Sequence, residues 1–192
     1  GWNSSIILRG ISKMPYEIHL KEQKDIIKFH LIKIYNIDLS KLDNVDIYLD
    51  TNLRNLIALK LWRELLGDRL PSGPQQYLNE IISNFNQIII LGLVGFKIPA
   101  YMLIRRSIEN LLTFLYYKDH YIEFLKKEHD SDAKRRFITS KDLRDYVEQY
   151  PFFAEYPDFD NTMIDNLIKR LMESWKSQYA ELSNFAHGST IK

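Results

Sequence analysis

The residues best suited to chemistry are two arginines and a glutamate inside an apolar helical pattern, and a histidine near the end of the chain. Ile104–Glu109 reads Ile-Arg-Arg-Ser-Ile-Glu, and Leu182–Gly188 reads Leu-Ser-Asn-Phe-Ala-His-Gly. Charged side chains beside a core cost stability unless they have partners. These two stretches are therefore the first candidates for a functional site.

The two arginines differ in how they face the core of a helix predicted over residues 99–117. At about 100° per residue, the apolar side chains gather on one face, and Arg105 lies roughly 70° from its centre. Arg106 points nearly opposite that face. Glu109 follows Arg105 by four residues, which predicts contact between their side chains. The predicted apolar face comprises Tyr101, Ile104, Ile108, Leu111, Leu112 and Leu115.

A second polar flank is predicted on the last helix, beside an apolar stripe that includes Trp175. Tyr179, Ser183 and His187 follow one another at intervals of four residues and share this flank. If the two helices pack antiparallel, Arg105 and His187 share one groove. A guanidinium holds phosphate through its fork of donors, and an imidazole transfers protons near neutral pH. This pairing suits phosphodiester chemistry without a metal.

The same residues also have a purely structural interpretation. Arg105 and Glu109 can form an ion pair that closes the edge of a core. His187 can interact favourably with the C-terminal end of the helix dipole, and Ser183 can bond back to the helix backbone. The residues alone leave both interpretations open.

Helical patterns long enough to position these residues run through most of the chain. Residues 17–35 favour a helix, with a strand as the alternative because the end of the segment is rich in β-branched residues. Asp50 or Thr51 is expected to cap a helix that ends at Gly67, and Pro71–Pro74 is the clearest break. Further helices are predicted over residues 75–94, from 99 to about 117, from Ser140 or Lys141 to 149, and from Asp160 or Asn161 to Gly188.

Composition supports a folded helical domain and excludes several classes of protein. The 192 residues are 45% hydrophobic and 13% aromatic, which favours one domain with a substantial core. The apolar periods along the chain predict that this domain is a single all-α bundle of about six helices. Residues 1–70 are expected to form an N-terminal helical layer, and residues 71–192 the functional core. A net charge of +1 gives no overall basic field for nucleic acid. The absence of cysteine excludes disulfides and thiol catalysis.

The most apolar window, residues 88–96, is interpreted as a buried helix. It is about half the roughly 20 apolar residues that a membrane-spanning helix needs, and Lys97 and Pro99 follow at once. We therefore expect no membrane association. The absence of cysteine and of a signal-peptide pattern leads us to expect a cytoplasmic location.

Three other clusters of charged or aromatic residues are more simply interpreted as surface or core than as functional sites. His120 and Glu123, with residues 128–132, could supply metal ligands, but solvated surface is favoured because nothing enforces a common centre. Lys134–Arg136 begins the most basic run, which could bind RNA, yet the neighbouring aspartates favour a solvated face. The aromatic residues of segment 150–159 are expected to pack against the core. No metal and no cofactor is predicted.

Two segments resemble the divergent outer branches of the HEPN superfamily, which are all-helical domains of prokaryotic defence and toxin systems. They are LGLVGFKIPAYMLIRRSIENLLTFLYY and, after a polar insertion, YAELSNFAHGS, so the resemblance covers about residues 75–192. It implies a helical bundle, frequent homodimers and, in active members, a metal-independent endoribonuclease. In those members an arginine and a histidine from each protomer meet across the dimer groove.

The chain departs from the active members in one respect. They place arginine four to six residues before the histidine on a single helix, whereas Glu181, Leu182 and Ser183 occupy those positions before His187. The resemblance therefore implies that a different helix supplies the guanidinium. The site residues that the resemblance implies in this chain are Arg105, Glu109 and His187, with Arg106, Ser183 and Tyr179 as secondary candidates.

Together these observations give two hypotheses of function. The first is an RNA-directed defence or toxin-type protein, dimeric, with RNA as its substrate and an antitoxin or effector protein as a further partner. The second is a non-catalytic helical interaction or dimerisation module, in which the same residues form a structural Arg-Glu-His network.

Overall fold

The computed structural model describes residues 16–67, 69–129, 138–150 and 161–186, which form an all-α bundle, as predicted. This part of the chain contains seven α-helices, one short 3-10 helix and no strand, so the strand alternative for the end of segment 17–35 is wrong. The elements are α1 (Tyr16–Lys33), η1 (Leu39–Lys41), α2 (Val45–Gly67), α3 (Gln75–Leu93), α4 (Lys97–Asp119), α5 (Tyr121–His129), α6 (Ser140–Glu148) and α8 (Asn161–Ala186).

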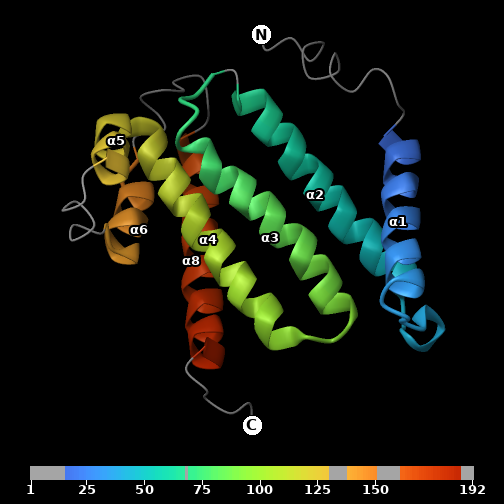
Figure 1. Cartoon of the computed structure of the whole chain (residues 1–192). Helices are drawn as coiled ribbons and strands as arrows, with labels where there is room; N and C mark the ends of the chain where they lie inside the picture. The colour runs from blue at the N-terminus through green and yellow to red at the C-terminus, as the bar shows by residue number, and fades with distance from the viewer. Residues whose placement is uncertain (1–15, 68, 130–137, 151–160, 187–192) are drawn as a thin grey trace.

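Helix α4 lies at the centre of the bundle, with α3 along one side and α6 and α8 along another (Figure 1). Leu112 packs in an apolar cluster shared with α6 and α8, whereas Phe114 packs in a separate cluster with α3. Asn110 and Tyr117 are buried on the same side of the helix as Phe114. The prediction of a single apolar face on this helix was therefore wrong, because α4 is covered from two directions.

The N-terminal helices pack onto α3 and share one apolar cluster with it. Leu49 and Leu53 of α2 are almost fully buried there, together with Leu20 of α1 and Ile89 of α3. The cluster thus contains residues from before and after the break at Pro71–Pro74. The cluster joins α1, α2 and α3, and α4 packs on α3, so these four helices follow one another across the molecule (Figure 1).

Helix α2 begins at Val45, earlier than the predicted cap at Asp50 or Thr51. Val45 and Leu49 lie one turn apart and are both buried in the N-terminal cluster, so their burial extends the helix. Asp50 instead lies inside the helix, where its Oδ2 accepts from Nε of Arg54 at 2.7 Å and its Oδ1 lies 3.4 Å from Nζ of Lys24. Asp50 therefore links α1 to α2.

The polar segment after α4 contains one helix that was predicted and one that was not. The predicted helix, α6, begins at Ser140, and Thr139 caps it through a reciprocal pair of bonds with Asp142. The additional helix is α5, whose Phe124 is buried and lies edge-on to the ring of Tyr117 at 5.6 Å between centroids. A short polar helix with one buried aromatic residue shows too little periodicity of apolar residues to be predicted from the sequence.

The apolar window of residues 88–96 lies mostly in α3, where Ile88, Ile89 and Leu93 are buried as predicted. Within the ranges that the structure describes, no helix combines the length and the apolar character needed to cross a bilayer.

Candidate functional site

Helices α4 and α8 pack side by side and run in opposite directions (Figure 1). This is the antiparallel arrangement that the predicted groove required. It brings Arg105 of α4 against Tyr179 of α8, 74 residues further along the chain. The contact joins the predicted Arg105–Glu109 pair to the predicted polar flank of the last helix.

Three side chains meet at this contact, and we call them the Arg105 cluster: Arg105, Glu109 and Tyr179. Nε of Arg105 donates to Oε1 of Glu109 at 3.2 Å, and Nη2 donates to the Tyr179 hydroxyl at 2.7 Å. The same hydroxyl donates to Oε1 of Glu109 at 3.3 Å. The cluster is therefore a closed triangle of cation, carboxylate and phenol.

The aromatic ring of Tyr179 holds the cluster against the core. The guanidinium carbon of Arg105 lies 4.6 Å from the centroid of this ring, and Trp175 stacks on the ring at 4.7 Å between centroids. Trp175 is buried among α4, α6 and α8, with the guanidinium carbon of Arg144 5.0 Å from its own ring. Helices α4, α6 and α8 thus all contribute to positioning Arg105.

The Arg105 cluster is half-buried and open to solvent on one side. The side chain of Arg105 is 26% exposed and that of Glu109 is 32% exposed. A guanidinium has three nitrogens that carry donors, and in the described part of the chain Nη1 of Arg105 has no hydrogen-bond partner. An oxyanion can therefore reach Arg105, in competition with the carboxylate of Glu109.

The structure does not place the side chains of two further predicted site residues, Ser183 and His187. The side chain of Ser183 and the whole of His187 lie outside the described residues. His187 directly follows Ala186, the last residue of α8, which stands seven residues beyond Tyr179. Seven residues correspond to about 10 Å along a helix axis.

Arg106 lies in a different environment from Arg105. Its Nε donates to Oε1 of Glu80 on α3 at 2.7 Å, so the side of α4 opposite the predicted apolar face is covered by α3. The hydrogen bond from Arg106 holds the pKa of the Glu80 carboxyl below its usual value. Arg106 therefore joins α4 to α3 and takes no part in the Arg105 cluster.

Because of the Arg106–Glu80 pair, we expect the fold to be slightly less stable at acid pH than at neutral pH. Because the pKa of Glu80 is lowered in the folded state, its stabilising contribution is present at neutral pH and is lost as the pH falls through that lowered pKa. We expect Glu80→Gln to cost at most about 1 kcal/mol at pH 7, since the pair is exposed. Thermal melts at neutral and acid pH should show a smaller pH dependence in this variant than in the wild type.

Glu64→Gln is the matched control, because Glu64 is an exposed glutamate of α2. It should leave the pH dependence of melting unchanged. Equal pH profiles for Glu80→Gln and the wild type would contradict the assignment of Glu80 as a contributor to acid sensitivity.

The residues considered as a metal pair are engaged elsewhere. Nδ1 of His120 lies 2.9 Å from the carbonyl oxygen of Tyr116, and its ring stacks on the Tyr116 ring at 4.1 Å. The Tyr116 hydroxyl donates to Glu123. Burial, reinforced by this bond, raises the pKa of Tyr116, so the phenol stays protonated as a donor. Among the described residues, no group of three or more His, Asp or Glu side chains could hold a metal ion.

The other predicted clusters lie mainly outside the described residues. Lys134–Arg136 and the aromatic segment 151–159 belong to the ranges that the structure does not describe. Of the basic run, Lys141 is exposed on α6, and Arg144 packs over the Trp175 ring. Arg144 is thus part of the support for Tyr179.

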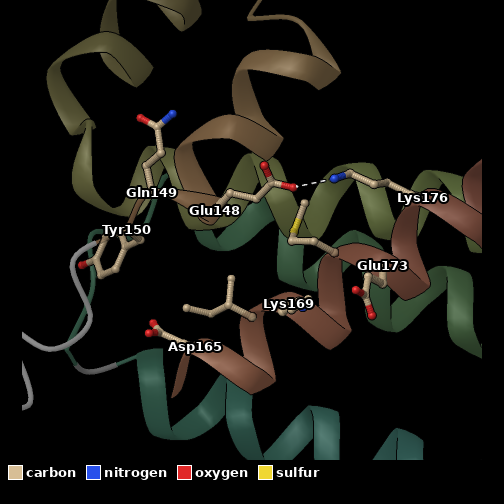
Figure 2. Close-up of a pocket in the computed structure, with 9 residues that line it drawn as sticks. Glu148, Gln149, Tyr150, Asp165, Lys169, Glu173 and Lys176 are labelled. Carbon is tan, nitrogen blue, oxygen red and sulfur yellow. Dashed lines mark ion pairs between the residues drawn. The ribbon is translucent and has the colours of Figure 1, made fainter. Parts of the chain in front are cut away.

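A groove between the end of α6 and α8 was not predicted from the sequence. It has a volume of about 440 Å³, and Figure 2 shows its charged side chains around the opening, with an ion pair of 2.9 Å between Glu148 and Lys176. Three carboxylates and two ammonium groups line it, so its charge does not favour a phosphate. The lining residues are Glu148, Gln149, Tyr150, Asp165, Ile168, Lys169, Met172, Glu173 and Lys176.

Comparison of the chain with models of protein families, with curated proteins and with solved structures gives no match. The chemistry of the Arg105 cluster and the two segments that it joins are therefore the basis for its function.

Proposed function

We propose that this chain is a HEPN-like, RNA-directed protein of the defence or toxin type, acting as a metal-independent endoribonuclease in the cytoplasm. Arg105 binds a phosphate of the RNA, Glu109 and Tyr179 orient Arg105, and His187 transfers the proton. The observation that carries the proposal is the 2.7 Å contact between Arg105 and Tyr179, which joins the two segments resembling that family. An antitoxin or effector protein would restrain such an activity.

The proposed reaction needs no metal because the RNA supplies its own nucleophile. The 2′-hydroxyl attacks the neighbouring phosphorus, the bond from phosphorus to the 5′ oxygen of the next nucleotide breaks, and a 2′,3′-cyclic phosphate remains. His187 accepts the proton of the 2′-hydroxyl, and the leaving 5′ oxygen takes a proton from water. Arg105 stabilises the charge that develops on the phosphoryl oxygens.

A second candidate function is a non-catalytic helical interaction module. It is favoured by the position of Glu109, whose carboxylate lies 3.2 Å from Nε of Arg105 and offsets the charge that a phosphate would seek. In this alternative, the Arg105 cluster serves only to tie α4 to α8.

RNA cleavage by the purified full chain, in the presence of a chelator, separates the two candidates. We expect single-stranded RNA to be cleaved, and Arg105→Ala and His187→Ala each to lower the rate by about 100-fold or more. Arg63→Ala is the matched control, because Arg63 is an arginine of α2 whose Nε donates to Asn79. It should cleave at the wild-type rate.

Thermal melting of the same variants completes the test. On the catalytic proposal, His187→Ala melts at nearly the wild-type temperature although it is inactive. A wild-type chain that never cleaves RNA, combined with a lowered melting temperature in Arg105→Ala, would instead establish the interaction module.

A further inference from the structure

Helix α1 carries apolar side chains on two opposite faces. Leu20, Ile27 and Leu31 lie on the face toward α2, where they contribute to the N-terminal cluster. At about 100° per residue, a second apolar group is centred about 180° away from that face. We call it the outer face of α1; it consists of Ile18, Ile26, Phe29 and Ile32, which are 48%, 49%, 57% and 45% exposed.

The outer face has no neighbour in the described part of the chain. Helix α1 packs against α2 and η1, and it forms one edge of the molecule (Figure 1). Ile34 and Tyr35, directly after α1, are also exposed and extend the apolar surface. A row of large apolar side chains at an edge is typical of a surface that another protein covers.

Charged residues on this face are arranged so that the face complements itself. Glu22 and Asp25 lie in the N-terminal half of α1 beside the exposed Lys21, and Lys33 ends the helix; among the described residues, Glu22, Asp25 and Lys33 have no ion-pair partner. By contrast, Lys24 and Lys28 pair with carboxylates of α2 on the inner side. In an antiparallel copy of the same helix, the carboxylate of Glu22 and the ammonium group of Lys33 come to the same level and attract each other.

We propose that a second copy of this chain docks on the outer face of α1, with the two helices antiparallel about a two-fold axis. An axis between residues 27 and 28 places Phe29 opposite Ile26 of the other copy and Lys33 opposite Glu22. Each of these contacts then occurs twice. Because one helix face is small compared with a standard interface, we expect a dimer in the micromolar range.

This dimer is independent of the proposed RNA chemistry. Helices α2 and α3 separate α1 from α4, so the two Arg105 clusters lie apart rather than sharing one groove (Figure 1). A dimer through α1 would therefore persist in a chain that does not cleave RNA, and a failure of either proposal leaves the other intact.

Analytical sedimentation of the full chain tests the proposal by measuring its mass at protein concentrations of about 1 to 200 µM. This range brackets the micromolar affinity expected for a small interface. We expect the mass to rise from the 22.9 kDa of one chain toward twice that value. Phe29→Glu should abolish this rise. Ile122→Glu, which alters the 71% exposed isoleucine of α5, is the matched control and should dimerise like the wild type.

A charge exchange tests the antiparallel arrangement. Glu22→Lys and Lys33→Glu should each weaken the dimer, and the double variant should restore it. A wild-type chain that stays monomeric throughout, or a Phe29→Glu variant that still dimerises, would overturn the proposal. A monomeric wild type whose melting temperature falls on Phe29→Glu would show that another part of the same chain, such as residues 1–15, covers the face.

Discussion

Replacing Trp175 with alanine should lower the free energy of unfolding by about 3–5 kcal/mol. Trp175 is 6% exposed and lies in the cluster formed by α4, α6 and α8, together with Leu112, Leu143 and Met172. Its removal leaves a cavity at the point where three helices meet, and such cavities collapse only partly. In a chain of this size the melting temperature should fall by roughly 10 °C or more.

Trp175→Phe provides the matched control. The indole nitrogen of Trp175 is buried without a hydrogen-bond partner among the described residues, so phenylalanine removes ring area but breaks no hydrogen bond. We expect this variant to lose about 1–2 kcal/mol, less than half of the loss in Trp175→Ala. Equal losses in the two variants would mean that the nitrogen, and not the packing of the ring, stabilises this cluster.

The same pair of variants reports on the Arg105 cluster. Tyr179 stacks on Trp175 and donates to Glu109, so the loss of the Trp175 ring removes the support beneath Tyr179. Any activity that depends on Arg105 should therefore fall in Trp175→Ala even at temperatures where the variant is folded. It should be largely retained in Trp175→Phe, which keeps an aromatic surface.

Gly73→Ala should destabilise the fold by about 1–3 kcal/mol, although Gly73 lies in a turn. A Cβ atom at this position would overlap the ring of Phe124 on α5. That ring is only 4% exposed and is held between Tyr117, at 5.6 Å, and Tyr121, at 5.9 Å. It cannot turn away without disturbing its neighbours, so the turn and α5 must separate slightly.

A double-mutant cycle with Phe124 isolates this steric cause. Phe124→Ala removes the overlapping atoms, so adding Gly73→Ala to it should cost much less than in the wild type. Gly95→Ala is the control: Gly95 has a φ of +84° and open space around its Cβ position, so its cost comes from the backbone. That cost should be unchanged by Phe124→Ala. Additive losses for Gly73 and Phe124 would contradict the predicted overlap.

Contacts within single helices could be predicted from the sequence alone. The apolar periods and turn residues predicted α3, α6 and α8 nearly to their ends, because helical geometry repeats locally. The pairing of Arg105 with Glu109 followed in the same way, since residues four apart lie on one flank of a helix. Such predictions need no knowledge of what surrounds the helix.

Contacts between helices depended on the tertiary structure. The sequence predicted a shared groove if α4 and α8 packed antiparallel, but only their packing brought the Tyr179 hydroxyl within 2.7 Å of Nη2 of Arg105. Packing likewise directed Arg106 to Glu80, because α4 is buried on two sides instead of one. The partner that a side chain contacts on another helix depends on which apolar faces pack together. That packing is the one that leaves little apolar surface of the whole chain in contact with water.

What the sequence determined by itself is the all-α class, most helix positions and the residues that share a flank. What only the tertiary structure decided is the environment of each flank: His120 and Glu123 both contact Tyr116, and no described residue covers the outer face of α1. The physical reason is one of range. Helical hydrogen bonds connect residues four apart, whereas burial depends on segments brought together from distant parts of the chain.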